Sequence, residues 1–182
     1  KTLQHPNICR LHAVHHEKHA VYLICERAWE TLYQRHVRMR RLGAKPRMVT
    51  LLRTWSPITA ALAYLHARKL MHRDLKSENV LICDDEALKV TDFGLAKAIV
   101  DGDQNHTSET GSYRWMSPEV IRHERYDEKC DVYSLAMLFY ETLTLSVPFK
   151  SNMTPVQVAL GVATQSMRPP PPPPPTPGHT PI

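Results

Sequence analysis

A charged loop that leads directly into an apolar run constrains this chain more than any other feature. The stretch HRDLKSENVLI, residues 72–82, places four charged side chains before three apolar ones: Arg73, Asp74, Lys76 and Glu78, then Val80, Leu81 and Ile82. A purely solvated loop would not need the apolar end, and a buried strand would not tolerate unpaired charges. We therefore expect a loop that holds polar groups in fixed positions, anchored by a short buried strand.

The polar groups of this loop are those that phosphoryl transfer requires. The reaction needs a carboxylate to orient the attacking hydroxyl, a positive charge near the transferred phosphoryl group, and oxygen ligands for Mg²⁺. Asp74 is the candidate base, Lys76 the candidate cation and Asn79 a candidate ligand. The stretch TDFG, residues 91–94, adds a second carboxylate, Asp92, directly after a predicted strand.

The pattern around the loop predicts both strands and helices. Residues 8–15 and 19–26 read as a β-hairpin, and residues 79–84 and 88–93 as two strands around an acidic turn. Apolar residues recur at helical spacing between Leu51 and Leu65. Because Pro57 removes a backbone hydrogen bond, we expect a kink there or a helix that begins near Ser56. Residues 131–144 read as a buried helix and residues 154–163 as an amphipathic one.

Bulk composition indicates a soluble globular chain. Of its 182 residues, 42% are hydrophobic and 23% charged, with a net charge of +5. The four cysteines are widely spaced, which favours a reduced intracellular protein over a disulfide scaffold. No apolar run reaches membrane-spanning length. We expect a cytoplasmic location, although a longer protein containing this chain could carry a membrane anchor elsewhere.

Taken in order, these motifs resemble the signatures of eukaryotic protein kinases. His72-Arg73-Asp74, Asn79, Asp92-Phe93-Gly94 and the SPE of residues 117–119 follow one another as they do in that family. HRDLKSEN and GSYRWMSPEV are most similar to the tyrosine-kinase-like group of serine/threonine kinases. The resemblance runs over nearly the whole chain and implies ATP and Mg²⁺ as cofactors and a protein substrate.

The resemblance also implies a role for individual residues. Asp74 would be the catalytic base, Lys76 would contact the γ-phosphate, and Asn79 and Asp92 would hold Mg²⁺. His72 and Arg73 complete the catalytic loop. The residues expected to bind the nucleotide base, besides Asn79 and Asp92 at its phosphates, are Glu26, Ala28 and Leu81, with Cys25 at the position that limits access behind the base. Asp131 matches the buried aspartate that holds the catalytic loop.

By the same resemblance, residues 92–119 form an activation segment. Its hydroxyl residues give the phosphorylation candidates: Thr107, Ser108, Thr110 and Ser112. Arg73 and Lys97 match the basic pocket that pairs with a phosphorylated residue, because a phosphate carries nearly two negative charges. We single out Thr107 or Ser108 as the site, whereas Ser112 matches a hydroxyl that packs near Asp74 and Lys76.

The predicted fold class is α+β, a protein-kinase-like fold made mainly of the helical C-lobe with the last two strands of the N-lobe. Residues 1–28 would be the N-lobe remnant and hinge, residues 29–168 the C-lobe, and residues 169–182 a proline-rich tail. No GxGxxG loop or strand lysine with its partner glutamate can be placed. We therefore expect an incomplete catalytic domain that is inactive alone.

Other functions rest on single features. A non-catalytic kinase-like fragment could act as a binding module through its C-lobe and its polyproline tail. Residues 169–175 are seven consecutive prolines, which suit SH3 or WW domains at residues 169–177 or serve as a spacer. The basic run of residues 35–47 lacks aromatic residues for base stacking, so we expect no nucleic-acid partner.

Overall fold

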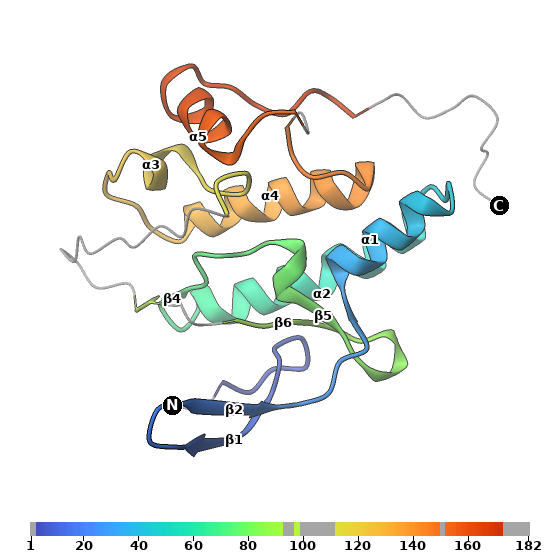
Figure 1. Ribbon diagram of the computed structural model, residues 1–182, viewed down its shortest axis with the longest axis vertical. Helices are drawn as coiled ribbons and strands as arrows, with labels where there is room; N and C mark the ends of the chain where they lie inside the picture. The colour runs from blue at the N-terminus through green and yellow to red at the C-terminus, as the bar shows by residue number, and fades with distance from the viewer. Residues whose placement is uncertain (1–2, 93–96, 99–111, 150–151, 173–182) are drawn as a thin grey trace.

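The computed structural model describes residues 3–92, 97–98, 112–149 and 152–172. Its long axis runs from an N-terminal hairpin, through a small sheet and the helices on the side of the sheet away from the hairpin, to the last helix (Figure 1). The prediction of an α+β, protein-kinase-like fold is confirmed. In the part of the chain described, no helix is long and apolar enough to cross a membrane.

In the described residues, short strands form three small antiparallel sheets. Strands β1 (Leu11–His16) and β2 (Val21–Cys25) make the expected hairpin. Strand β5 (Val80–Ile82) lies between β3 (Glu30–Thr31) and β6 (Leu88–Val90), while β4 (Leu70–Met71) pairs with β7 (Lys97–Ala98). The 3₁₀ turns η1 (Ser77–Asn79) and η2 (Asp84–Glu86) flank β5. The catalytic loop is thereby held between β4 and β5.

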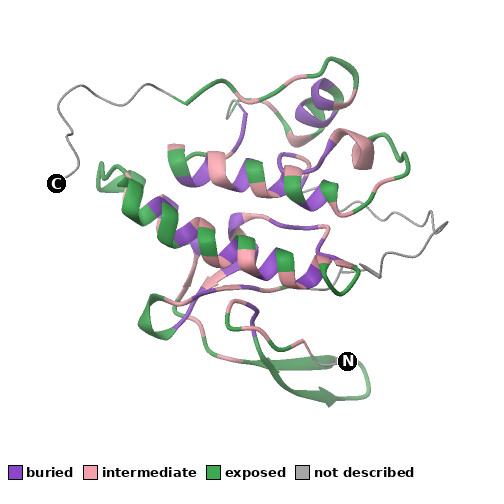
Figure 2. Cartoon of the chain, turned by 180° about the vertical axis from the view of Figure 1, so that it is seen from behind, coloured by how far each residue is buried: buried purple, intermediate pink, exposed green. Residues whose placement is uncertain are grey.

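Five α-helices make up the rest of the described structure. They are α1 (Leu32–Arg41), α2 (Met48–His66), α3 (Pro118–Ile121), α4 (Lys129–Thr144) and α5 (Pro155–Thr164). Capping boxes start α1 and α5, where Thr31 and Thr154 each accept from the backbone of a glutamine three residues later. The buried residues gather where α2 packs between α4 and the three-stranded sheet of β3, β5 and β6 (Figure 2).

Helix α2 does not begin near Ser56. It runs from Met48 through Pro57 to His66 without interruption. The reason is tertiary: Leu51, Ile58 and Leu62 are all buried on one face, and this burial outweighs the backbone hydrogen bond that proline removes. Helix α4 is less buried than expected, since Val132 and Leu143 are exposed.

The hairpin is exposed along its whole length. Every residue of β1 and β2 is solvent-accessible, including Val21 at 59% and Leu23 at 65%. The residues just before the hairpin join it to strand β6: Cys9 N–H donates to Val90 O at 2.8 Å, and Val90 N–H donates to Asn7 O at 2.9 Å. An isolated two-stranded hairpin is marginally stable, so this part of the chain contributes little to the core.

Candidate active site

The carboxylate of Asp74 lies at the centre of the site and is 6% exposed. Lys76 Nζ donates to Asp74 Oδ2 at 2.7 Å and to Ser112 Oγ at 2.8 Å. Asn79 Nδ2 donates to the Asp74 carbonyl at 2.8 Å and to its Oδ2 at 3.0 Å. The structure thus brings together the predicted base, cation and metal ligand, and one oxygen of Asp74 receives two donors.

Asp131, at the start of α4, fixes the backbone of the catalytic loop. Its carboxylate accepts from the amides of His72 and Arg73 and from His66 Nε2, each at 2.8 Å. Burial opposes ionisation of Asp131, but the hydrogen bonds from His66 and the two amides outweigh it and lower its pKa. Arg73 has a φ of 70°, a left-handed conformation that these bonds hold in place.

His72 is a fully buried link between the loop and the end of β6. Its Nε2 lies 2.9 Å from Thr91 O, and its Nδ1 accepts from Asp74 N–H at 3.3 Å. Burial lowers the pKa of His72, so the neutral ring with its proton on Nε2 satisfies both contacts. The imidazole therefore connects Asp74 to the residue that precedes Asp92.

Asp92 and Asn79 lie on neighbouring segments. Thr91 N–H donates to Asn79 O at 3.0 Å, which places Asp92, exposed and with a φ of 62°, beside η1. Asn79 donates its amide nitrogen to Asp74, and its amide oxygen is the atom that could bind a metal ion. A carboxylate and an amide oxygen are ligands that suit Mg²⁺, and the residues present fit such an ion. Phe93 and Gly94 lie outside the described residues.

The predicted hinge lies between the hairpin and β3. The Glu26 side chain accepts from Arg10 N–H at 2.7 Å and from Lys89 Nζ at 2.5 Å. Among the described residues, neither the amide nor the carbonyl of Ala28 makes a hydrogen bond, so both can pair with an adenine edge. Strand alternation buries Val80 and Ile82 and leaves the half-buried Leu81 on the opposite face.

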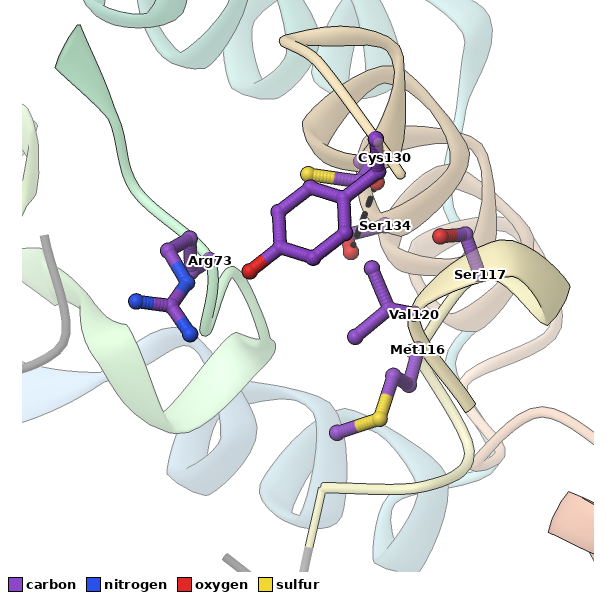
Figure 3. A pocket seen from close by; sticks show the side chains of 7 residues that line it. Arg73, Met116, Ser117, Val120, Cys130 and Ser134 are labelled. Atoms are coloured by element: carbon purple, nitrogen blue, oxygen red, sulfur yellow. Dashed lines mark hydrogen bonds between the residues drawn. The ribbon is translucent and has the colours of Figure 1, made fainter. Parts of the chain in front are cut away.

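Arg73 borders a small hollow with a volume of about 10 Å³ (Figure 3). Met116, Ser117, Val120 and Cys130 line it from the other side. This space has room for about one water molecule and is too small for a small-molecule ligand. The Arg73 guanidinium also lies 5.9 Å from the ring centroid of Tyr126, which is within the range of a cation–π contact.

The phosphorylation candidates fall into two groups. Thr107, Ser108 and Thr110 lie outside the described residues. Ser112 is 5% exposed and accepts from Lys76, so its hydroxyl is poorly accessible to a modifying enzyme. The geometry favours the packing role of Ser112 over the modified one.

A buried hydrogen-bond network, which the sequence pattern did not predict, lies behind the catalytic loop. Ser77 Oγ donates to Glu141 Oε1 at 2.6 Å, and Trp115 Nε1 donates to Glu141 Oε2 at 3.1 Å. Ser77 and Glu141 are 0% and 1% exposed. The only sequence signal was a glutamate inside the apolar run of residues 131–144, because a buried carboxylate needs partners.

Comparison with known proteins agrees with this geometry. A family model described as "Protein kinase domain" matches residues 1–171, and the chain therefore belongs to the protein kinase domain family. Over 171 residues it is 38% identical to serine/threonine/tyrosine-protein kinase HT1 of Arabidopsis thaliana, covering 92% of this chain and 42% of that protein.

Two further relatives show the same relationship. Serine/threonine-protein kinase STY17 of Arabidopsis thaliana is 42% identical over 120 residues, or 66% of this chain and 21% of its own length. Mitogen-activated protein kinase kinase kinase 13 of Mus musculus is 35% identical over 173 residues, or 93% of this chain and 17% of its own length. The resemblance to tyrosine-kinase-like serine/threonine kinases is confirmed, and the chain spans less than half the length of each of these relatives.

Proposed function

We propose that the full-length protein carrying this chain is an ATP-dependent serine/threonine kinase, with Asp74 as the base that accepts the proton of the attacking hydroxyl. The observation that carries the proposal is the fixed cluster of Asp74, Lys76, Asn79 and Ser112. Lys76 bridges Asp74 and Ser112, so its charge lies beside the carboxylate that must face the substrate hydroxyl. Relatives with serine/threonine kinase in their names support the same reaction class.

Each residue has a role that follows from its position. Asp74, oriented by Asn79 and Lys76, holds the substrate hydroxyl and takes its proton. Asn79 and Asp92 would hold Mg²⁺, which neutralises charge on the phosphates when bound. The Ala28 backbone would receive the adenine edge, with Leu81 against the base. Lys76 would stabilise the negative charge of the phosphoryl group as it transfers.

The test is the Asp74→Asn variant of the full-length protein, assayed by transfer of labelled phosphate to myelin basic protein. We expect loss of at least about a hundredfold in kcat, because general-base catalysis and orientation are both removed. The matched control is Asp85→Asn, since Asp85 is an exposed aspartate in η2 with a φ of 54° that asparagine also adopts. Equal activity of Asp74→Asn and wild type would refute the assignment.

The second candidate, a non-catalytic binding module, has one observation in its favour. Met167 and Arg168 hold the start of the tail, since Met167 N–H donates to Gly161 O at 3.1 Å and Arg168 lies 5.5 Å from the Tyr133 ring centroid. The chain leaves this anchor with residues 170–172 exposed. Isolated SH3 and WW domains titrated against the wild type and a Pro171→Ala/Pro172→Ala variant would test it. Kinase activity absent from the full-length protein, together with proline-dependent binding, would favour this candidate.

A further inference from the structure

His36 is a buried histidine whose ring nitrogens have no hydrogen-bond partner among the described residues. It lies on α1, is 3% exposed, and its Nδ1 is 3.6 Å from Glu141 Oε1. Leaving a buried polar group without a hydrogen-bond partner is unfavourable. The separation exceeds the roughly 2.7–3.2 Å of a normal N–H···O bond by a few tenths of an ångström, so a small movement of α1 would complete the contact.

Glu141 is the residue through which His36 can reach the active site. One of its oxygens accepts from Ser77, the residue that begins η1 and lies three positions after Asp74. The other accepts from Trp115, three positions after Ser112. Glu141 therefore already joins the catalytic loop to the segment that carries Ser112, and Oε1 faces both Ser77 and His36.

Charge around Glu141 makes a third donor favourable. Burial raises the pKa of Glu78, and the negative charge of nearby Glu141 adds to that rise. A buried carboxylate needs more compensation than two neutral donors provide. His36 Nδ1, 3.6 Å from Glu141 Oε1, is positioned to supply that donor. Helix α1 also packs on the end of α4 through Arg40, whose Nη1 donates to Leu145 O at 3.3 Å. Figure 1 shows α1 running from the three-stranded sheet of β3, β5 and β6 toward that end of α4.

We propose that His36 is a positioning residue: its Nδ1–H donates to Glu141, and Glu141 in turn fixes Ser77 and Trp115 on either side of the catalytic base. Helix α1 begins directly after Thr31, so this contact links the predicted hinge to the catalytic loop. The inference rests on the proposed kinase function for its kinetic consequence. Its structural content, a proton on Nδ1 directed at Glu141, is independent of that function.

The kinetic test compares His36→Gln, Glu141→Gln and the double variant in the full-length protein, with Mg-ATP and myelin basic protein. We expect each single variant to lower kcat about tenfold, since misplacement of a catalytic loop by less than an ångström is costly, while the KM for ATP stays within about twofold. The double variant should be no slower than Glu141→Gln, because both changes break one network.

The matched control is His15→Gln, since His15 Nε2 lies 3.7 Å from Glu17 Oε1 but the pair is solvent-exposed. This variant should retain wild-type kcat. Full activity of His36→Gln, or losses that multiply to about a hundredfold in the double variant, would overturn the proposal. A loss of folded protein alone would lower the yield and leave kcat per folded molecule unchanged, and that outcome would also overturn it.

A spectroscopic experiment tests the same contact without the variants and without phosphoryl transfer, so it still decides if the variants do not fold or the wild type is inactive. Selective ¹⁵N-histidine labelling of the wild-type protein reports which ring nitrogen of His36 carries a proton. We expect a slowly exchanging proton on Nδ1. A neutral ring with its proton on Nε2 would overturn the proposal whatever the kinetics. Absence of phosphoryl transfer with the Nδ1 proton present would instead refute the proposed function and leave the contact standing.

Discussion

At the scale of single residues, the effect of burial on charge is clearest at His72, whose ring is buried in its neutral form. Burial lowers the pKa of its ring below the ordinary value of 6.5. As the pH falls below about 6.5, the His72 ring therefore takes up a proton in the unfolded chain but not in the folded one. The free energy of unfolding decreases over this pH range. Above that pH the unfolded ring is neutral as well, so the full stability is present.

The pH dependence of unfolding should therefore change when His72 is replaced. We expect the free energy of unfolding of the wild type to fall by up to about 1.4 kcal/mol per pH unit from this group below pH 6.5. His72→Phe should remove that component, as measured by urea unfolding at pH 7.5, 6.5 and 5.5. Parallel pH profiles for the two proteins would contradict the assignment.

Asp131 is the residue whose replacement should most disturb the loop backbone. The amides of His72 and Arg73 donate to different oxygens of Asp131, so asparagine there would set its NH2 group against one of them and leave that amide unpaired. We expect Asp131→Asn to lower the free energy of unfolding by about 1–3 kcal/mol. Asp127→Asn is the control, because the exposed Asp127 accepts from Lys129 N–H at 2.9 Å and asparagine can still accept there. An equal effect of both changes would count against the special role of Asp131.

Asp131 and His72 affect the free energy of unfolding over different pH ranges. The pKa of Asp131 is lowered from 3.8, so its stabilisation is fully present above that value. It is lost only as the pH falls further, through the folded pKa. Stability thus declines in two steps on acidification, first through the histidine and then through the aspartate.

At the scale of elements, α2 shows a local preference overruled by packing. Pro57 stands tenth in a helix of 19 residues and leaves the Arg53 carbonyl without its usual donor. Pro57→Ala should therefore raise the free energy of unfolding by about 1–3 kcal/mol. Ser56→Ala, at the exposed neighbouring position, should change it by only a few tenths. Both follow from thermal or urea unfolding, and a destabilised Pro57→Ala would show that proline serves the helix in another way.

In helix α1, two of the four arginines, Arg35 and Arg38, are paired with acidic side chains. Arg35 contacts Glu30 and Glu86, and Arg38 contacts Glu30 at 2.7 Å. Hydrogen bonding to Arg35 lowers the pKa of Glu86. The arginines of α1 nearest the sheet therefore already have acidic partners, whereas Arg40 donates to the carbonyl of Leu145 at 3.3 Å.

At the scale of the whole molecule, burial sorts the four free cysteines into two classes. Cys25 is exposed, whereas Cys9, Cys83 and Cys130 are buried. Burial raises the pKa of Cys9 to about 11 and that of Cys130 still further. Because the thiolate is the reactive form, only Cys25 should react quickly with a disulfide reagent at pH 8. Stopped-flow absorbance should show one fast thiol that Cys25→Ser removes, and two or more fast thiols would contradict the fold.

The sequence predicted the parts of this molecule that depend on local pattern. The loop of residues 72–79, the strands around the acidic turn and the hairpin follow from charge, alternation and turn residues, and the ordered motifs pointed to the family. It could not predict the course of α2, since burial of Leu51 and Ile58 outweighs the preference of Pro57.

Only the tertiary structure decided the network behind the site. Ser77 and Glu141 are 64 positions apart, and His36 lies 105 positions before Glu141, so no periodicity relates them. Their meeting depends on how α1, α4 and the catalytic loop pack. The sequence by itself determined which residue types could perform phosphoryl transfer, because that chemistry needs particular groups at short spacing. The packing of distant helices decided how those groups are held, because hydrogen bonds act through space and not along the chain.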